Sequence, residues 1–117
     1  MREIKFRIWD KNECKMKVVK EMNLKEVNLI NDLFPLMQYT NCYDINGKEI
    51  YEGDIVEKEI MESIFDDSKL IGVVKMIEGC WCVVDDKKKV AKNLWSETDV
   101  NRVIGNVYEN PELLEEN

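Results

Sequence analysis

Apolar and polar residues alternate along most of the chain, and this pattern predicts strands. Near the N-terminus, Ile4, Phe6 and Ile8 alternate with charged or amphipathic residues, as in a strand with one buried face. The alternation resumes over residues 14–18 after a short polar stretch that is typical of a turn. The opening of the chain therefore predicts a β-hairpin.

Glycine-containing turns divide the remaining apolar segments. Asn46–Gly47 is the strongest turn signal, because both residues accept the positive φ that tight hairpins need. Glu78–Gly79 separates the apolar segments 72–77 and 80–84 and predicts a second hairpin. Gly105 lies inside the last predicted strand, over residues 103–108, and indicates a bulge.

Three stretches are read less directly from the pattern. Residues 22–34 fit either a helix that starts at an asparagine cap or two short strands, and we favour strands. Residues 90–95 fit a strand or a short helix. At the C-terminus, Asn110 as cap and Pro111 at the first helical position predict a short helix, which the two following leucines would dock.

Taken together, closely spaced strands with turn residues between them predict a mainly β fold, either a sandwich or a partly closed barrel, with a short C-terminal helix. Because no linker or repeat interrupts the 117 residues, we expect a single domain over residues 1–117. The stretch from Gly53 to Val84 has the pattern of a small SH3-like barrel.

Composition and charge narrow the functional classes. The chain is 44% hydrophobic and 35% charged, with a net charge of −7, so it can form a core but repels nucleic acid and anionic membranes. It shows neither a signal peptide nor a membrane span. We expect a cytoplasmic protein, whose four cysteines are free thiols.

Two patterns resemble metal sites without matching one. Cys80 and Cys82 share a strand face and could join Cys14 and Cys42, but zinc sites space such pairs differently and often use histidine, which this chain lacks. We interpret the thiols as packing residues. Asp44 and the Asn46–Gly47 pair match part of a calcium loop, but turn formation explains them better. The sequence therefore predicts no metal site.

Catalytic chemistry has little support. Glu49, Glu52 and Asp54 lie close together, and paired carboxylates can perform acid–base work if their pKa values differ. The aspartate more simply organises a bend after Gly53. There is no histidine for a nucleophile pair and no glycine-rich phosphate loop. We predict a non-enzymatic protein without catalytic residues or cofactors.

Aromatic side chains are the best candidates for contacts. Three tryptophans and four tyrosines are spread through the chain, and such residues are common at interfaces as well as in half-buried strands. The candidate interaction residues are Trp9, Tyr39, Tyr51, Asp54 and Trp81. The lysine run 87–89 is read as a solvated loop.

Three segments resemble the YopX family of phage and prophage proteins. They are EIKFRIWD at 3–10, LMQYTNCYDINGKEIYEGDIV at 36–56 and VIGNVYENPELL at 103–114. The resemblance implies a β-rich pseudo-barrel and a phage or prophage origin, but no activity. Asn41 stands where the family usually has glycine; because asparagine accepts the left-handed conformation, the turn should survive.

Several functions are consistent with these patterns. The preferred hypothesis is a phage or prophage accessory protein that binds an unknown host or phage protein and forms homo-oligomers. One alternative is a nucleic-acid module that stacks bases on tryptophan or tyrosine. The other is an acidic mimic of nucleic acid that occupies a host protein.

Overall fold

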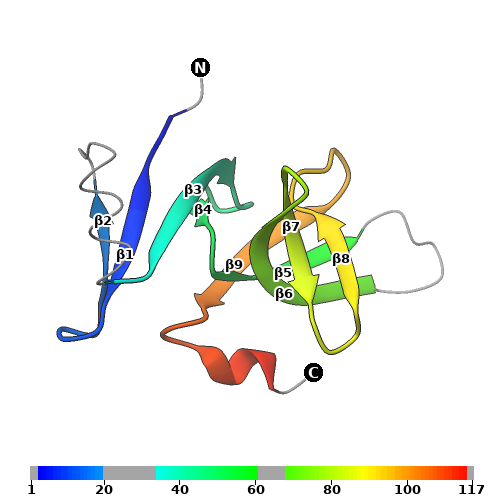
Figure 1. Cartoon of the computed structure of the whole chain (residues 1–117). Coiled ribbons are helices and arrows are strands. Elements are labelled where there is room, and N and C mark those ends of the chain that lie inside the picture. The colour runs from blue at the N-terminus through cyan, green and yellow to red at the C-terminus, as the bar shows by residue number, and fades with distance from the viewer. Residues whose placement is uncertain (1–2, 20–33, 61–67, 116–117) are drawn as a thin grey trace.

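Strands are the main secondary structure of the chain, which the computed structural model describes over residues 3–19, 34–60 and 68–115 (Figure 1). The strands in these ranges are β1 (Phe6–Asp10), β2 (Lys15–Val19), β3 (Leu36–Tyr43), β4 (Glu49–Tyr51), β5 (Asp54–Ile60), β6 (Ser68–Ile77), β7 (Cys80–Asp85), β8 (Val90–Asn93) and β9 (Val100–Asn106). The predicted mainly β class is confirmed. Residues 90–93 form a strand, whereas the stretch 22–34 lies mostly outside the described ranges.

The first sheet has the order β2-β1-β3-β4 and contains the predicted N-terminal hairpin. Its β3–β4 hairpin turns at Asn46 and Gly47, and Gly47 has a φ of +82°. A bulge interrupts β3 at Asn41, where φ is +65°. The asparagine side chain also bonds both backbone groups of Glu3. Asparagine therefore sustains the left-handed turn, as expected.

The second sheet has the order β8-β7-β6-β5-β9 and curls into a half-barrel (Figure 1). Strands β5 to β8 form a meander, and β9 returns to pair with β5. The Glu78–Gly79 turn has φ values of +50° and +83°, which suits a two-residue hairpin loop. The register of β5 and β9 shifts beside Gly105, so the predicted bulge is confirmed.

Strand β6 changes partner near its middle, and this change curls the sheet. Its first part pairs with β5 from Ser68 to Val73, and its second part pairs with β7 from Val73 to Ile77. At the switch lies the buried Gly72, where an added Cβ would meet the Val84 carbonyl oxygen at 2.5 Å. The strand can bend here because glycine lets the β7 backbone approach closely.

The two sheets share a core and are tied together by polar contacts. The buried cluster contains Ile50 of the first sheet together with residues of the half-barrel: Val56, Leu70, Val74, Val83 and Leu94. Arg7 Nη2 donates to Asp54 Oδ1 at 2.7 Å. Gly53 joins the sheets through its backbone, since its N–H donates to Val74 and its carbonyl accepts from Val107.

Asp44 forms a further tie between the sheets. One carboxylate oxygen accepts the N–H groups of Asn46 and Lys48, which closes the β3–β4 turn. The other accepts the N–H of Val103 on β9 at 3.0 Å. Burial tends to raise the pKa of Asp44, but these three donors outweigh it, so its pKa lies below the ordinary value. The predicted turn role is confirmed.

The Asp44→Asn variant should be less stable by about 1–3 kcal/mol at neutral pH, because an amide NH2 group replaces one carboxylate oxygen and then faces a backbone N–H donor. A carboxyl with a lowered folded-state pKa stabilises the protein above its unfolded pKa of about 3.9 and loses that effect as pH falls through the folded value. The deficit should therefore shrink below about pH 4. Urea denaturation across pH measures it, with the exposed Asp86→Asn as control. A deficit that does not change with pH would contradict the assignment.

The predicted short C-terminal helix is present only as a turn. Residues Pro111–Leu114 form only a single 3-10 turn, η1, with the expected proline at its start. Asn110 does not cap it with its side chain, since Oδ1 accepts the Asn106 N–H instead. Because that bond closes the turn after β9, the side chain is not available to start a longer helix.

Burial along the N-terminal hairpin also differs from the simple alternating pattern. Ile4 and Val18 are exposed, whereas Arg7 and Ile8 are both buried although neighbouring positions point to opposite faces of β1. The charged Arg7 is buried because Asp54 of the other sheet pairs with it. The alternation therefore located the strands correctly but did not determine which residues are buried.

Candidate contact surface around Trp95

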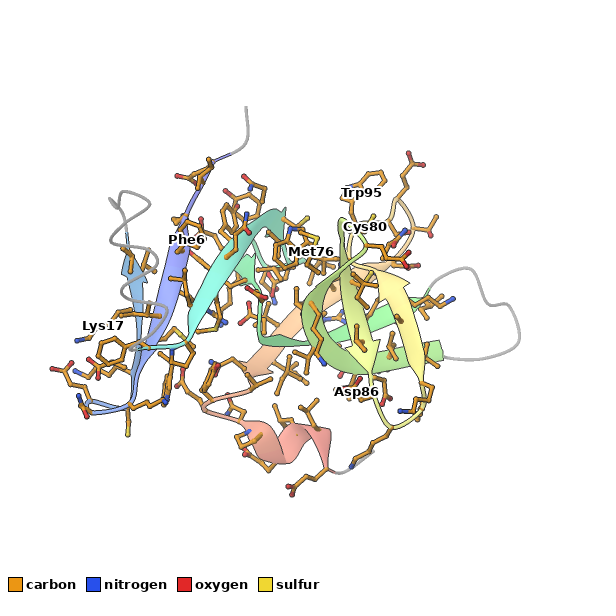
Figure 2. The ribbon with its side chains drawn as sticks, in the orientation of Figure 1. Phe6, Lys17, Met76, Cys80, Asp86 and Trp95 are labelled. Carbon is orange, nitrogen blue, oxygen red and sulfur yellow. The ribbon has the colours of Figure 1, made fainter. Side chains whose placement is uncertain are left out.

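Three hollows on one side of the molecule meet at Trp95. They are lined by the end of β3 with the turn that follows it, by the β6–β7 hairpin and by the loop from β8 to β9. The hollow that contains Met76, Cys80 and Trp81 measures about 530 Å³. Figure 2 shows Met76, Cys80 and Trp95 on the same side of the chain. We call this region the Trp95 cleft.

Four of the nine exposed large apolar side chains of the described residues line these hollows. Trp95 is 68% exposed. Tyr43 and Ile45 line the hollow on one side of it, and Met76 lines the hollow on the other. All three are exposed as well. Single exposed apolar residues are ordinary, but a contiguous group is typical of a binding surface.

The loop that carries Trp95 is anchored by a buried lysine. Lys58 of β5 is 0% exposed. Its Nζ donates to the Leu94 carbonyl at 3.1 Å and to Asn101 Oδ1 at 3.2 Å, and Asp99 Oδ2 lies 3.5 Å away. The Leu94 N–H in turn donates to the Trp81 carbonyl at 2.8 Å. The residue before the exposed tryptophan is therefore fixed on both backbone groups.

Burial of this lysine disfavours the charged form of its side chain. Burial lowers the pKa of Lys58 below its ordinary value, while the Asp99 carboxylate acts in the opposite direction. Replacing a buried ion pair by packed apolar groups is often neutral or stabilising. The stability of the fold alone therefore does not explain why a lysine occupies this position. The hydrogen bonds from Lys58 to the β8–β9 loop do explain it.

The Lys58→Met variant tests this positioning role. We expect the free energy of unfolding to fall by about 1–3 kcal/mol, because methionine fills the space but leaves the Asp99 carboxylate without its counter-ion and the Asn101 side-chain oxygen without its donor. Amide exchange over residues 94–101 should become faster. Because the folded-state pKa of Lys58 is lowered, the wild type should also gain stability relative to the variant as pH rises from that value toward the ordinary one.

Hydrogen-exchange mass spectrometry and denaturation measure both effects. The matched control is Lys69→Met, since Lys69 is exposed and forms a surface pair with Glu57 at 3.7 Å. Unchanged exchange over the loop in the Lys58→Met variant would contradict the positioning role.

The four cysteines are all free, and they occupy different settings. Cys42 and Cys80 line the Trp95 cleft, whereas Cys82 is buried and its pKa is raised by that burial and by Cys80. Cys14 lies in the β1–β2 turn of the other sheet. Over residues 3–19, 34–60 and 68–115, no three acidic, cysteine or histidine side chains are arranged to hold a metal ion.

Each carboxylate of the 49–54 group has a structural partner. Glu49 pairs with Lys5, and Glu52 Oε1 accepts the Gln38 N–H at 3.3 Å. Asp54 is buried; its Oδ2 accepts the Tyr51 N–H at 2.8 Å, which confirms that it organises the bend. Burial raises the pKa of Asp54, and the Arg7 guanidinium offsets part of that shift.

The aromatic residues predicted for contacts lie mainly inside the fold. Tyr39 and Tyr51 are buried, with ring centroids 5.4 Å apart, and burial raises the pKa of both. Trp9 is half-buried and stacks on Tyr108 with centroids 5.6 Å apart. Trp81 packs partly against the core and lines the Trp95 cleft. Of these aromatic residues, only Trp81 belongs to the exposed cleft.

Sequence reasoning missed Trp95 and Lys58 as site residues. Trp95 ends the segment 90–95, which fits a strand or a short helix. No pattern in the neighbouring residues therefore indicated that its side chain is exposed. Lys58 occupies an inward position between Val56 and Ile60 of β5. A lysine at that point of an apolar alternation was the one available sign that a charge is buried there.

Fold and surface together define a class: a small, mainly β protein with a curled half-barrel and an exposed aromatic cleft. The YopX protein family matches residues 19–115, and the chain belongs to this family. Within the described ranges, no helix has the length and apolar character needed to cross a membrane.

Solved structures share the fold. Protein EF1440 from Enterococcus faecalis is 22% identical, with a TM-score of 0.62 over 97% of this chain and 99% of that one. Protein yopX from Bacillus subtilis is 23% identical, with the same TM-score over 94% and 95%. No curated protein matches the chain.

Proposed function

We propose that the chain is a non-enzymatic accessory protein of a phage or prophage, which works in the bacterial cytoplasm by binding another protein through the Trp95 cleft. The supporting observation is the exposed Trp95 on a loop anchored by a buried lysine. Exposing a tryptophan and burying a charge both oppose folding. Their combination is best explained by a contact that the tryptophan makes with a partner, since buried tryptophans often dominate interface energies.

The Trp95→Ala variant should abolish retention of the partner. Tagged wild-type chain, Trp95→Ala and Val18→Ala are incubated with bacterial lysate and compared by quantitative mass spectrometry. Val18 is the matched control, because it is an exposed apolar residue on β2, in the other sheet. We expect proteins that the wild type and Val18→Ala retain and that Trp95→Ala loses by about tenfold or more. Equal retention by all three chains would refute the proposal.

A nucleic-acid module is the second candidate, because Trp95 and Tyr43 are exposed beside a curled β-sheet and aromatic platforms can stack bases. Carboxylates beside the cleft and the net charge of −7 oppose it. A gel shift with single-stranded DNA and RNA at low salt decides between the two. A Trp95-dependent shift would favour the nucleic-acid function.

A further inference from the structure

Negatively charged side chains outnumber positively charged ones around the Trp95 cleft. The residues that line its three hollows include three carboxylates, Asp44, Glu97 and Asp99, and one ammonium, that of Lys92. Two of the carboxylates have partners within the fold: Asp44 accepts backbone N–H groups and Asp99 pairs with Lys58. Glu97 is exposed and forms no ion pair with any residue of the described ranges.

Trp95 and Glu97 therefore offer, within one short loop, an aromatic face and a carboxylate that pairs with no cation of the described residues. Both line the same hollow, of about 470 Å³, which also contains Asn93 and Ile60. A guanidinium is the side-chain group that suits both features, because it stacks on an indole face and donates two parallel N–H groups to a carboxylate. An ammonium is more strongly hydrated and lacks that planar fork.

We infer that the partner presents an arginine side chain to Trp95 and Glu97, with an apolar neighbour that enters the hollow lined by Met76, Cys80 and Trp81. This inference rests on the proposed function and specifies its partner. The loop is well suited to such a contact, since Lys58 and Asn101 fix the Leu94 carbonyl and so limit the freedom lost on binding.

Charge also favours a basic segment of a protein partner over a second copy of the chain or a nucleic acid as the ligand of the cleft. A second copy of the chain would bring another net charge of −7 to this acidic loop. Nucleic acid would bring phosphates to the same acidic loop. A basic segment of a protein partner removes both conflicts, and complementary charge speeds association and excludes wrong partners.

Selection from a displayed library of random 12-residue peptides tests the inference directly. Peptides are selected on the wild-type chain, and the enriched sequences are synthesised for fluorescence polarisation. We expect enrichment of arginine next to an apolar residue. Replacing that arginine by lysine should weaken binding by about fivefold or more. The Glu97→Gln variant should weaken it similarly, and Trp95→Ala by about tenfold or more.

The Glu112→Gln variant is the matched control, because Glu112 is an exposed carboxylate on η1. It should bind the peptides as the wild type does, and circular dichroism should show that all variants are folded. Peptides that need Trp95 but neither arginine nor Glu97 would overturn this inference and leave the proposed function standing. Selection that yields only peptides indifferent to Trp95, or none, would overturn both.

Discussion

The Arg7→Met variant is expected to lower the free energy of unfolding by about 3–5 kcal/mol, because it leaves a buried carboxylate without its counter-ion. The Arg7 guanidinium donates to Asp54 at 2.7 Å and to the Glu52 carbonyl at 3.3 Å, and it lies over the Tyr51 ring at 4.7 Å. Asp54 is 1% exposed. After the substitution its carboxylate would keep only the Tyr51 N–H as a donor.

The loss should depend on pH in a defined direction. Burial already raises the pKa of Asp54, and removal of Arg7 should raise it further. A carboxyl whose folded-state pKa exceeds its unfolded value makes the protein less stable as pH rises between the two values. The variant should therefore be closest to the wild type at acid pH. Urea denaturation at several pH values measures this.

Two further variants control the result. Lys17→Met removes an exposed cation that pairs with Asp10 at 2.9 Å, and it should cost no more than about 1 kcal/mol. The Arg7→Met, Asp54→Asn double variant should recover part of the loss, since no buried charge remains. If Arg7→Met were as mild as Lys17→Met, the pair would not be what joins the two sheets.

The Gly72→Ala variant is expected to cost about 3 kcal/mol, at the upper end for overpacking. The new Cβ would lie 2.5 Å from the Val84 carbonyl oxygen and 2.7 Å from its carbon. These are backbone atoms of a paired strand, so relief requires β6 and β7 to move apart. Thermal and urea denaturation measure the loss.

Gly79→Ala is the matched control for this substitution. Nothing lies within 4 Å of an added Cβ there, although the φ of +83° is unfavourable for alanine. It should cost about 1–2 kcal/mol from backbone strain alone. Equal losses at the two glycines would show that the sheet accommodates a methyl group at the point where β6 changes partner.

The accuracy of the sequence-based predictions depended on how local each feature is. The Asn46–Gly47 and Glu78–Gly79 turns were predicted correctly because their backbone conformations follow from the residues themselves. The fold class followed from alternation and from the YopX-like segments. The short C-terminal helix is only a 3-10 turn, and it lacks the predicted asparagine cap because the Asn110 side chain bonds a residue in the preceding strand.

The exposure of individual side chains was the feature that the sequence predicted least well. Tyr39, Tyr51 and Asp54 had the residue types of an interface, yet the structure buries all three where the two sheets meet. Trp95 had no distinguishing pattern and proved the most exposed of the three tryptophans. Residue type indicates what a side chain can do, whereas exposure depends on which other segments cover it.

The strands, their tight turns and the family to which the chain belongs follow from local residue patterns. The burial of Arg7 and Lys58 and the exposure of Trp95 depend instead on how distant segments pack together. The reason is separation along the chain: the Arg7–Asp54 contact spans 47 residues and the Lys58–Leu94 contact spans 36. Periodicity reports which face of one strand a side chain occupies, but burial depends on the distant strand that packs against that face.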